Sequence, residues 1–431
     1  MAEHPNVIKE LGTIFSALSK NPALTPEKAQ GLGLLGGLYL KAAGAHEKGE
    51  PTAWISFGIP PEIFWAMDIV PVVDLNLATI SLIPGKVEKY IDLATEAVPD
   101  YICSTNRIPL GLALSGDAPL PNIWVVQNAP CDSIPGLDSA MAKYFGIPYY
   151  SVHVPYVNSP LGYEYTARDL KKMIAWVEGQ TGRKLDVGRL KGAVQHSSRA
   201  HELMLKIREM AMLVPTPCSL NENRLAYTAM IQLAGTPEVV NYLQMIYDRA
   251  QDRLSGKLPY PIQEKLRIAW IYTVPTYSPG LIVDYMANEY GAISLTFMLN
   301  NMLVPPVKGD LDYEEMMLWL AQKVCNMPMT RECRGPWEVY ADSALDLVQN
   351  YKADGAIFSG HTACKSNWAA AKLVKDKIME EAGVPTLNLE TDFIDGRVTP
   401  GEAVRDQLIE FMALIQRNKR SREEKNQAAS R

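Results

Sequence analysis

The chain has 431 residues, of which 47% are hydrophobic and 21% charged, a composition typical of an ordinary globular protein with about two or three domains. Its net charge of −6 offers no basic surface, so we expect no nucleic-acid partner. No apolar run is long enough to span a bilayer, and the N-terminal sequence MAEHPNVIKELG lacks the apolar core of a signal peptide. We therefore expect a cytoplasmic protein with no membrane partner.

The N-terminal residues 1–50 are predicted to form a helical cover. Apolar side chains from Val7 to Leu18 recur at helical spacing, and the Gly- and Ala-rich segment 31–44 suits a closely packed helix. This part of the sequence contains no strand pattern, so we expect it to lie outside the sheets.

Residues 51–165 are predicted to form a first α/β domain. The domain opens with a strand at 53–57, a short helix at 60–67 that begins with proline, and a strand at 69–73. A strand, a helix and a strand at this spacing form a βαβ unit, in which the strands are parallel. The fold class is therefore α/β.

Residues 261–416 are predicted to form a second, related α/β domain. The phrase Gly146-Ile147-Pro148, which precedes a predicted strand at 149–154, matches Gly383-Val384-Pro385, which precedes another at 386–389. Further strands are predicted at 266–271, 293–297 and 356–358.

Two other segments complete the predicted organisation. Residues 166–260 have helical patterning, broken at Val214-Pro215-Thr216-Pro217, and are predicted to be a helical connecting segment. Residues 417–431 are charged and lack large apolar side chains, so we expect a frayed helix end followed by a disordered tail.

Three cysteines stand at predicted amino ends of helices. Cys131 follows the apolar run 123–126 and precedes a helix that Asp132 or Ser133 could cap. Cys364 follows the apolar run 355–358, and Cys103 follows the short apolar pair Tyr101-Ile102. The backbone N–H groups and the dipole at a helix amino end favour the thiolate, which binds metals and attacks substrates.

The pattern leaves three interpretations of these thiols open. They are ordinary small core residues, or ligands of zinc together with His361, or ligands of an iron–sulfur cluster at a cleft between the two α/β domains. No CxxC pair is present, so a metal site would need distant segments. Cys218, Cys325 and Cys333 have weaker contexts and are predicted to be structural.

Other candidate residues are fewer. His153, near the end of a predicted strand, is interpreted as a core histidine or a proton donor, and Tyr156 and His361 are further candidate donors. Glu62 suits the first turn of its helix without any further role. Neither a phosphate-binding P-loop nor a GxGxxG dinucleotide motif is present, so we expect no nucleotide hydrolysis by this chain.

Five phrases, in this order, resemble the family of benzoyl-CoA reductase and 2-hydroxyacyl-CoA dehydratase subunits over roughly residues 50–415. They are WISFGIPPEIFWAMDIVPV at 54–72, YICSTNRIPLG at 101–111, VVQNAPCDSIPG at 125–136, FSGHTACKSN at 358–367 and GVPTLNLETDFIDGR at 383–397.

The resemblance implies two flavodoxin-like parallel-sheet domains and one [4Fe–4S] cluster, with Cys103, Cys131 and Cys364 as its ligands and Ser56 near the open iron. It also implies a heterodimer with a paralogous cluster-bearing subunit. A separate iron–sulfur activator would hydrolyse ATP and supply low-potential electrons for a CoA-thioester substrate.

The branch of the family is less plainly marked. Where the dehydratase pattern has Pro-Glu-Asn after the second strand, this chain has Asp74-Leu75-Asn76. The missing glutamate favours the larger cluster-bearing subunit of a benzoyl-CoA reductase, an enzyme of anaerobic aromatic degradation, over a 2-hydroxyacyl-CoA dehydratase subunit. An electron-relay partner subunit and a stand-alone reductase of other small molecules are further alternatives.

Overall fold

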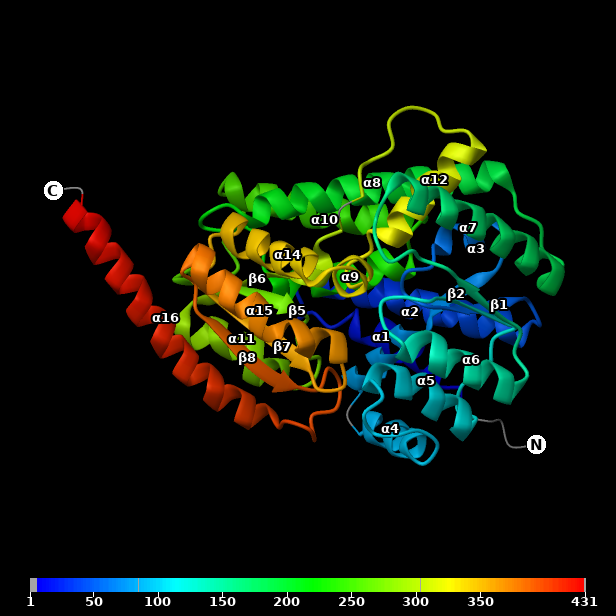
Figure 1. Ribbon diagram of the computed structural model, residues 1–431, viewed down its shortest axis with the longest axis horizontal. Coiled ribbons are helices and arrows are strands. Elements are labelled where there is room, and N and C mark those ends of the chain that lie inside the picture. The colour runs from blue at the N-terminus through cyan, green and yellow to red at the C-terminus, as the bar shows by residue number, and fades with distance from the viewer. Residues whose placement is uncertain (1–5, 84, 303, 430–431) are drawn as a thin grey trace. The chain divides into compact units, whose positions relative to one another are not determined.

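The computed structural model describes residues 6–83, 85–302 and 304–429, and these form two compact units (Figure 1). The first unit contains residues up to 207, 222–249 and 302–335, and the second contains 208–221, 250–301 and 336 onward. Each unit has its own parallel sheet of four strands.

Two paired helices, α1 (Val7–Leu18) and α2 (Pro26–Glu47), begin the first unit. The side chains of Asn6 and Thr25 accept hydrogen bonds from backbone N–H groups at the two helix starts. A Cβ at Gly12 would lie 2.8 Å from Leu40, so the small residues allow the helices to approach closely. The predicted helical character of this segment is confirmed.

The first sheet is parallel and has the strand order β2-β1-β3-β4. Its strands are β1 (Thr52–Ile55), β2 (Val70–Val73), β3 (Ile123–Gln127) and β4 (Tyr149–Val152). The connections contain α3 (Pro61–Ala66), η1 (Asp74–Leu82), α4 (Val87–Thr95), α5 (Ser104–Ser115) and α6 (Ser133–Phe145). The strand order reverses between β1 and β3, which is where open α/β sheets bind ligands.

Further helices lie wholly or mostly in the first unit. Their ranges are α7 (Pro160–Thr181), α8 (Val187–Ala211), α9 (Leu220–Gln232), α10 (Pro237–Leu254), α12 (Tyr313–Cys325) and α13 (Thr330–Arg334). The predicted helical patterning of 166–260 and its break near residue 214 are confirmed. Most of that segment belongs to the first unit, where α7 packs against α12.

The second sheet repeats the same order as β6-β5-β7-β8. Its strands are β5 (Leu266–Tyr272), β6 (Ala292–Phe297), β7 (Gly355–His361) and β8 (Thr386–Thr391). The helices are α11 (Pro279–Tyr290), η2 (Met298–Asn300), α14 (Trp337–Asn350), α15 (Lys365–Ala382) and α16 (Gly401–Ala429). Two flavodoxin-like parallel sheets were predicted, and the structure confirms this fold class.

The repeated Gly-aliphatic-Pro phrases have the same structural role in both units. Gly146 ends α6 with φ +70° and Gly383 ends α15 with φ +63°, a left-handed conformation that suits glycine. Each phrase then leads into the fourth strand of its sheet, β4 or β8. The predicted relation between the two α/β halves is therefore visible in the fold.

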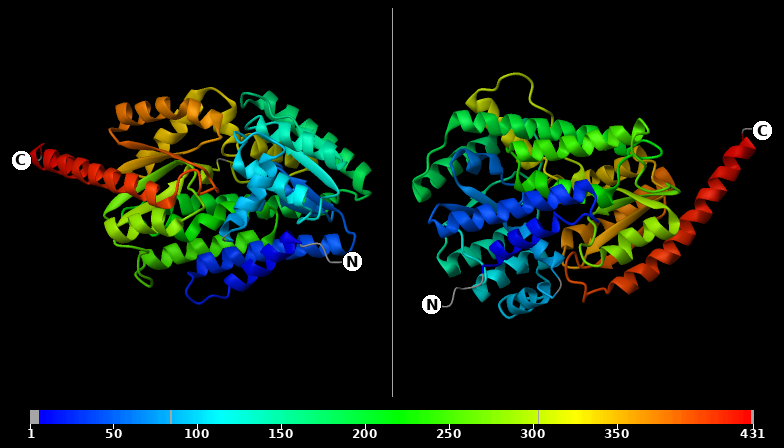
Figure 2. Two further views of the ribbon diagram at one scale, coloured as in Figure 1. Left: turned by 90° about the horizontal axis from the view of Figure 1, so that it is seen from below. Right: turned by 180° about the vertical axis from the view of Figure 1, so that it is seen from behind.

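The C-terminal segment differs from the prediction of a disordered tail. Helix α16 is one continuous helix to Ala429, as Figure 2 shows, and the last two residues lie outside the described part. Lys419 donates to Asp354 Oδ2 at 2.9 Å, and the Arg422 guanidinium lies 3.4 Å from Asp354 Oδ1. These ion pairs hold the helix in a stretch that lacks large apolar side chains. Among the helices described, none has the length and apolar character needed to cross a membrane.

Candidate functional site

The carboxyl edge of the first sheet brings Ser56 and Gln127 together at the point where the strand order reverses. Ser56 follows β1 and Gln127 ends β3, and both side chains are fully buried. The backbone N–H of Gln127 donates to Ser56 Oγ at 3.0 Å. Ser56 therefore lies at the expected ligand-binding edge of this sheet.

The Gln127 side chain fixes the segments around this edge. Its Nε2 donates to Thr330 Oγ1 at 2.9 Å, which holds α13 against the end of β3. A Cβ at Gly58, in the loop between β1 and α3, would overlap Gln127 Oε1, so a larger residue there would displace the Gln127 amide. The amide thus positions both the Ser56 loop and α13.

Cys103 and Cys131 are half-buried thiols of the first unit at amino ends of helices, as predicted. Cys103 is the N-cap residue of α5, and Cys131 precedes α6 by two residues. Asp132 is the N-cap residue of α6, but its side chain makes no capping hydrogen bond.

The apolar pair before Cys103 does not form a strand. Tyr101 and Ile102 lie in a turn after α4, because this part of the chain is a helical insertion before β3. The Cys103 sulfur lies 2.8 Å from Thr105 Oγ1 within the first turn of α5.

In the second unit, Cys364 occupies the place that Cys131 occupies in the first. It is the N-cap residue of α15, and β7 ends three residues earlier at His361. The Cys364 N–H donates to the His361 carbonyl at 2.7 Å, which closes a tight turn between strand and helix. Both cysteines therefore follow the third strand of their own sheet.

The two candidate histidines have different surroundings. His361 is buried, its Nδ1 accepts from the Phe393 N–H at 3.2 Å, and the same nitrogen lies 3.4 Å from Asp392 Oδ2. His153 is exposed and contacts the edge of the Tyr165 ring, so the interpretation of a core histidine was wrong. Tyr156 is also exposed, at 64%.

The donor chemistry of Cys103, Cys131 and Cys364 fits an iron–sulfur cluster. All three are half-buried thiols at helix amino ends, where the thiolate is favoured. The buried amide of Asn106, one turn after Cys103, has no hydrogen-bond partner within the described structure, so a polar donor is available there. Across residues 6–83, 85–302 and 304–429, no three His, Cys, Asp or Glu side chains are gathered as metal ligands. The assignment of the three cysteines as ligands stays a prediction.

A buried ion pair joins α3 to α12 in the first unit. Glu62 Oε1 accepts from Ser197 Oγ at 2.6 Å and from the Lys323 ammonium, and both charged side chains are almost fully buried. The sequence predicted only a first-turn role for Glu62, because its partners lie 135 and 261 residues further along the chain.

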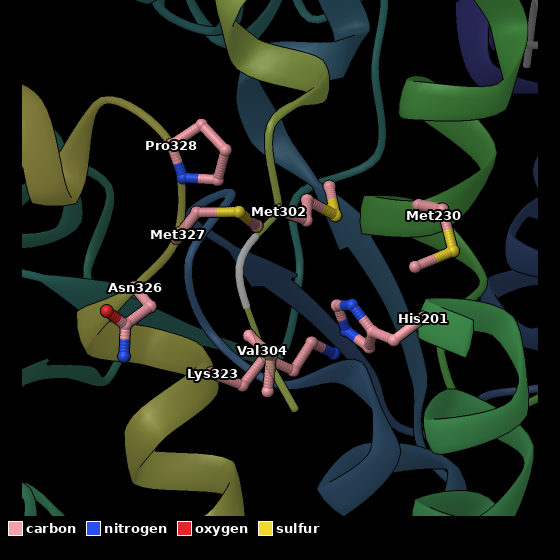
Figure 3. A pocket seen from close by; sticks show the side chains of 8 residues that line it. All are labelled: His201, Met230, Met302, Val304, Lys323, Asn326, Met327 and Pro328. Atoms are coloured by element: carbon pink, nitrogen blue, oxygen red, sulfur yellow. The ribbon is translucent and has the colours of Figure 1, made fainter. Parts of the chain in front are cut away.

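A small cavity of about 10 Å³ lies beside this ion pair (Figure 3). It is lined by His201, Met230, Met302, Val304, Lys323, Asn326, Met327 and Pro328. Burial and the neighbouring Lys323 charge lower the pKa of His201 to about 3, so its imidazole is neutral.

Two buried carboxyl groups of the first unit, Asp74 after β2 and Asp138 in α6, interact with each other. Asp74 follows β2, and its oxygens accept from Trp124 Nε1 at 2.8 Å and from the Leu75 N–H. Burial raises the pKa of Asp74 to about 7, and burial together with the Asp74 charge raises the pKa of Asp138 well above its usual value. Asp74 is thus directed into the core against α6.

Comparison with known sequences identifies the family. A family model described as "2-hydroxyglutaryl-CoA dehydratase, D-component" matches residues 57–415. The chain belongs to this family. The matched range contains Cys103, Cys131 and Cys364, and it begins directly after Ser56.

Two distant relatives are subunits of enzymes with different activities, a dehydratase and a reductase. The chain is 21% identical over 391 residues to the alpha subunit of lactoyl-CoA dehydratase of Anaerotignum propionicum, covering 82% of this chain and 88% of the relative. It is 20% identical over 418 residues to a subunit of the benzoyl-CoA reductase of Thauera aromatica, covering 89% and 93%. Both relatives are named as subunits, and both names specify CoA thioesters. The resemblance noted in the sequence is confirmed at the level of the family.

Proposed function

We propose that this chain is the iron–sulfur subunit of an ATP-driven benzoyl-CoA reductase, which converts benzoyl-CoA to a cyclic dienoyl-CoA. Cys103, Cys131 and Cys364 would be the protein ligands of one [4Fe–4S] cluster. The main support is the equivalent placement of Cys131 and Cys364 after the third strand of two like sheets, in a chain whose family acts on CoA thioesters.

The bound cluster would supply single electrons at low potential. The chain's own residues would hold and orient the reactants. The helix starts at α5, α6 and α15 favour the thiolate form of the three cysteines. The Ser56 hydroxyl accepts from the Gln127 N–H, so its own hydrogen is directed elsewhere and can donate to a ligand oxygen. His153 and His361 are the candidate proton donors, one exposed and one buried.

The placement of Asp74 supports the reductase branch. A dehydratase of the resembled type places an acid beside its substrate at the end of the second strand. Here Asp74 is 1% exposed, hydrogen-bonded to Trp124 and close to Asp138, so it is directed away from any ligand at the strand ends. Reduction of an aromatic ring needs electrons and protons but no such acid at this position.

A radical 2-hydroxyacyl-CoA dehydratase subunit is the second candidate. The description of the matching family and the alignment with a lactoyl-CoA dehydratase subunit favour it. In either case we propose a heterodimer with a paralogous cluster-bearing subunit, an ATP-hydrolysing iron–sulfur activator as electron donor, and a cytoplasmic location.

Turnover by the anaerobically purified heterodimer tests this proposal. Dithionite, or the activator with ATP, supplies electrons, and benzoyl-CoA and a 2-hydroxyacyl-CoA are offered separately. Formation of dienoyl-CoA is the expected result. Formation of enoyl-CoA alone would replace the reductase with the dehydratase. Failure of both reactions with a full cluster would favour an electron-relay subunit or a reductase of other small molecules.

A further inference from the structure

The cavity beside α8, α9 and α12 has the size of one water molecule. Its volume of about 10 Å³ is close to the space that one internal water needs. Three methionine side chains, Met230, Met302 and Met327, form much of its apolar wall. Figure 3 shows the side chains of His201 and Lys323 reaching toward each other at one side of the cavity.

His201 lacks the hydrogen bonds that a buried imidazole normally makes. The residue is 1% exposed, and neither ring nitrogen has a hydrogen-bond partner in the described structure. Because the imidazole is neutral, one nitrogen carries a hydrogen and the other is an acceptor. Buried polar atoms are almost always satisfied by protein or by ordered water, so a ligand is needed here.

The charges around the cavity exclude an ionic ligand. The Lys323 ammonium is balanced by Glu62, and the same Glu62 oxygen also accepts from Ser197. An added anion or cation would have no counter-charge in this buried place, which is costly. Lys323 has further N–H groups beyond the one given to Glu62, so a neutral acceptor oxygen suits it.

Two short connections link residues at the cavity to the carboxyl edge of the first sheet. Glu62 belongs to α3, which begins five residues after Ser56. Met327 and Pro328, which line the cavity, lie just before Thr330 in the sequence. The Thr330 hydroxyl accepts a hydrogen bond from the Gln127 side chain at 2.9 Å. Both connections lead back to the place where the strand order reverses.

We propose that this cavity binds one water molecule, held by a ring nitrogen of His201 and by Lys323 Nζ. The water accepts from the ammonium and either donates to or accepts from the imidazole, so both side chains gain a partner. It provides a proton-exchanging molecule in a place otherwise lined mostly by apolar side chains. The inference concerns the first unit alone and holds for either candidate reaction.

Three variants of the full chain test the water site. His201→Gln keeps a donor and an acceptor, His201→Leu removes both, and Met230→Leu is the matched control because it changes the wall without removing a hydrogen bond. We expect His201→Leu to lower the midpoint of chemical unfolding, His201→Gln to lower it less, and Met230→Leu to leave it nearly unchanged. An unchanged or raised midpoint in His201→Leu would overturn the proposal, because replacing two unsatisfied nitrogens by a hydrocarbon is not destabilising.

A high-resolution crystal structure of the wild-type chain is a second, independent test of the water site. It remains available if His201→Leu does not fold. The expected result is ordered water density within hydrogen-bond distance of His201 and Lys323. A dry cavity would overturn the proposal. Iron content and turnover do not enter either measurement, so the water site and the proposed function can fail separately.

Discussion

The two sheets have the same strand order, but their carboxyl edges differ. After β7 the second sheet has Cys364, and after β8 the Asp392 carboxylate accepts from the Ile394 and Asp395 N–H groups. The first sheet has Cys131 at the equivalent place, and a helical insertion before β3 adds Cys103. Gln127 Oε1 and the Asn106 amide have no hydrogen-bond partner among the described residues.

The comparison distinguishes features that both units share from features that only the first unit has. The repeat alone places one thiol in the turn after the third strand of each sheet. The third thiol, the buried ion pair and the small cavity belong to parts of the first unit outside this repeated turn. A ligand that uses all three cysteines therefore depends on the added elements as much as on the repeat.

The largest expected effect concerns the repeated pair. Cys131→Ser and Cys364→Ser should each lose most of the iron and nearly all activity while the chain still folds, because hydroxyl oxygen is a poor substitute for a soft thiolate ligand. Iron analysis and circular dichroism measure the two properties. Cys333→Ser, at a half-buried cysteine outside the proposed ligand set, is the control. Retention of a full cluster in either variant would remove that cysteine from the ligand set.

The buried ion pair of the first unit should contribute strongly to stability. Removal of the Lys323 charge by Lys323→Met leaves Glu62 buried without a counter-charge, which costs about 3–5 kcal/mol in the free energy of unfolding. Lys184→Met, in the exposed pair with Glu178, should cost less than about 1 kcal/mol. Urea denaturation measures the free energy of unfolding of both variants. Equal decreases in Lys323→Met and Lys184→Met would contradict the burial of the Glu62–Lys323 pair.

The carboxyl pair should make stability depend on pH. The folded pKa of Asp74 is raised to about 7, so the folded state binds protons more tightly than the unfolded state. The stabilisation is complete below the unfolded value of about 4 and is lost as pH rises through 7. Asp138→Asn removes the second carboxyl group with a raised pKa, whose ionisation also destabilises the folded state as pH rises, so this variant should gain stability relative to wild type between pH 5 and pH 8. A constant difference across this range would show that the pair does not titrate there, and Asp342→Asn on the surface is the control.

The smallest effect concerns the added thiol. The Thr105 hydroxyl should donate to the Cys103 thiolate, which stabilises the electron-rich reduced cluster. Thr105→Val should lower the reduction potential by about 20–60 mV, the equivalent of one hydrogen bond, whereas Thr105→Ser should retain it. Potentiometric titration followed by electron paramagnetic resonance measures the shift. Thr181→Val is the control. Equal reduction potentials in Thr105→Val and Thr105→Ser would exclude a role for the hydrogen bond from Thr105 to Cys103.

Much of the fold could be predicted from local patterns. The short apolar runs and the two Gly-aliphatic-Pro phrases marked strands and helix ends correctly, because each signal depends on neighbouring residues. The extension of α16 was missed because its charged residues form contacts with Asp354, 65 and 68 residues away in sequence.

The candidate site was only partly predictable for a similar reason. The position of Cys131 and Cys364 at helix starts follows from a strand, a loop and a helix in sequence. The Glu62–Lys323 pair and the Asp74–Asp138 pair depend on tertiary packing, and no local pattern marks them. The sequence around an acidic residue does not show that it will form a buried ion pair when its lysine partner is far away along the chain.

The most direct measurement is the iron and sulfide content of the anaerobically purified wild-type chain, with its electron paramagnetic resonance spectrum after dithionite reduction. We expect about four iron and four sulfide per chain and the spectrum of a reduced [4Fe–4S] cluster. A folded chain that contains no iron, or zinc in its place, would contradict the assignment of Cys103, Cys131 and Cys364 and the function proposed from it.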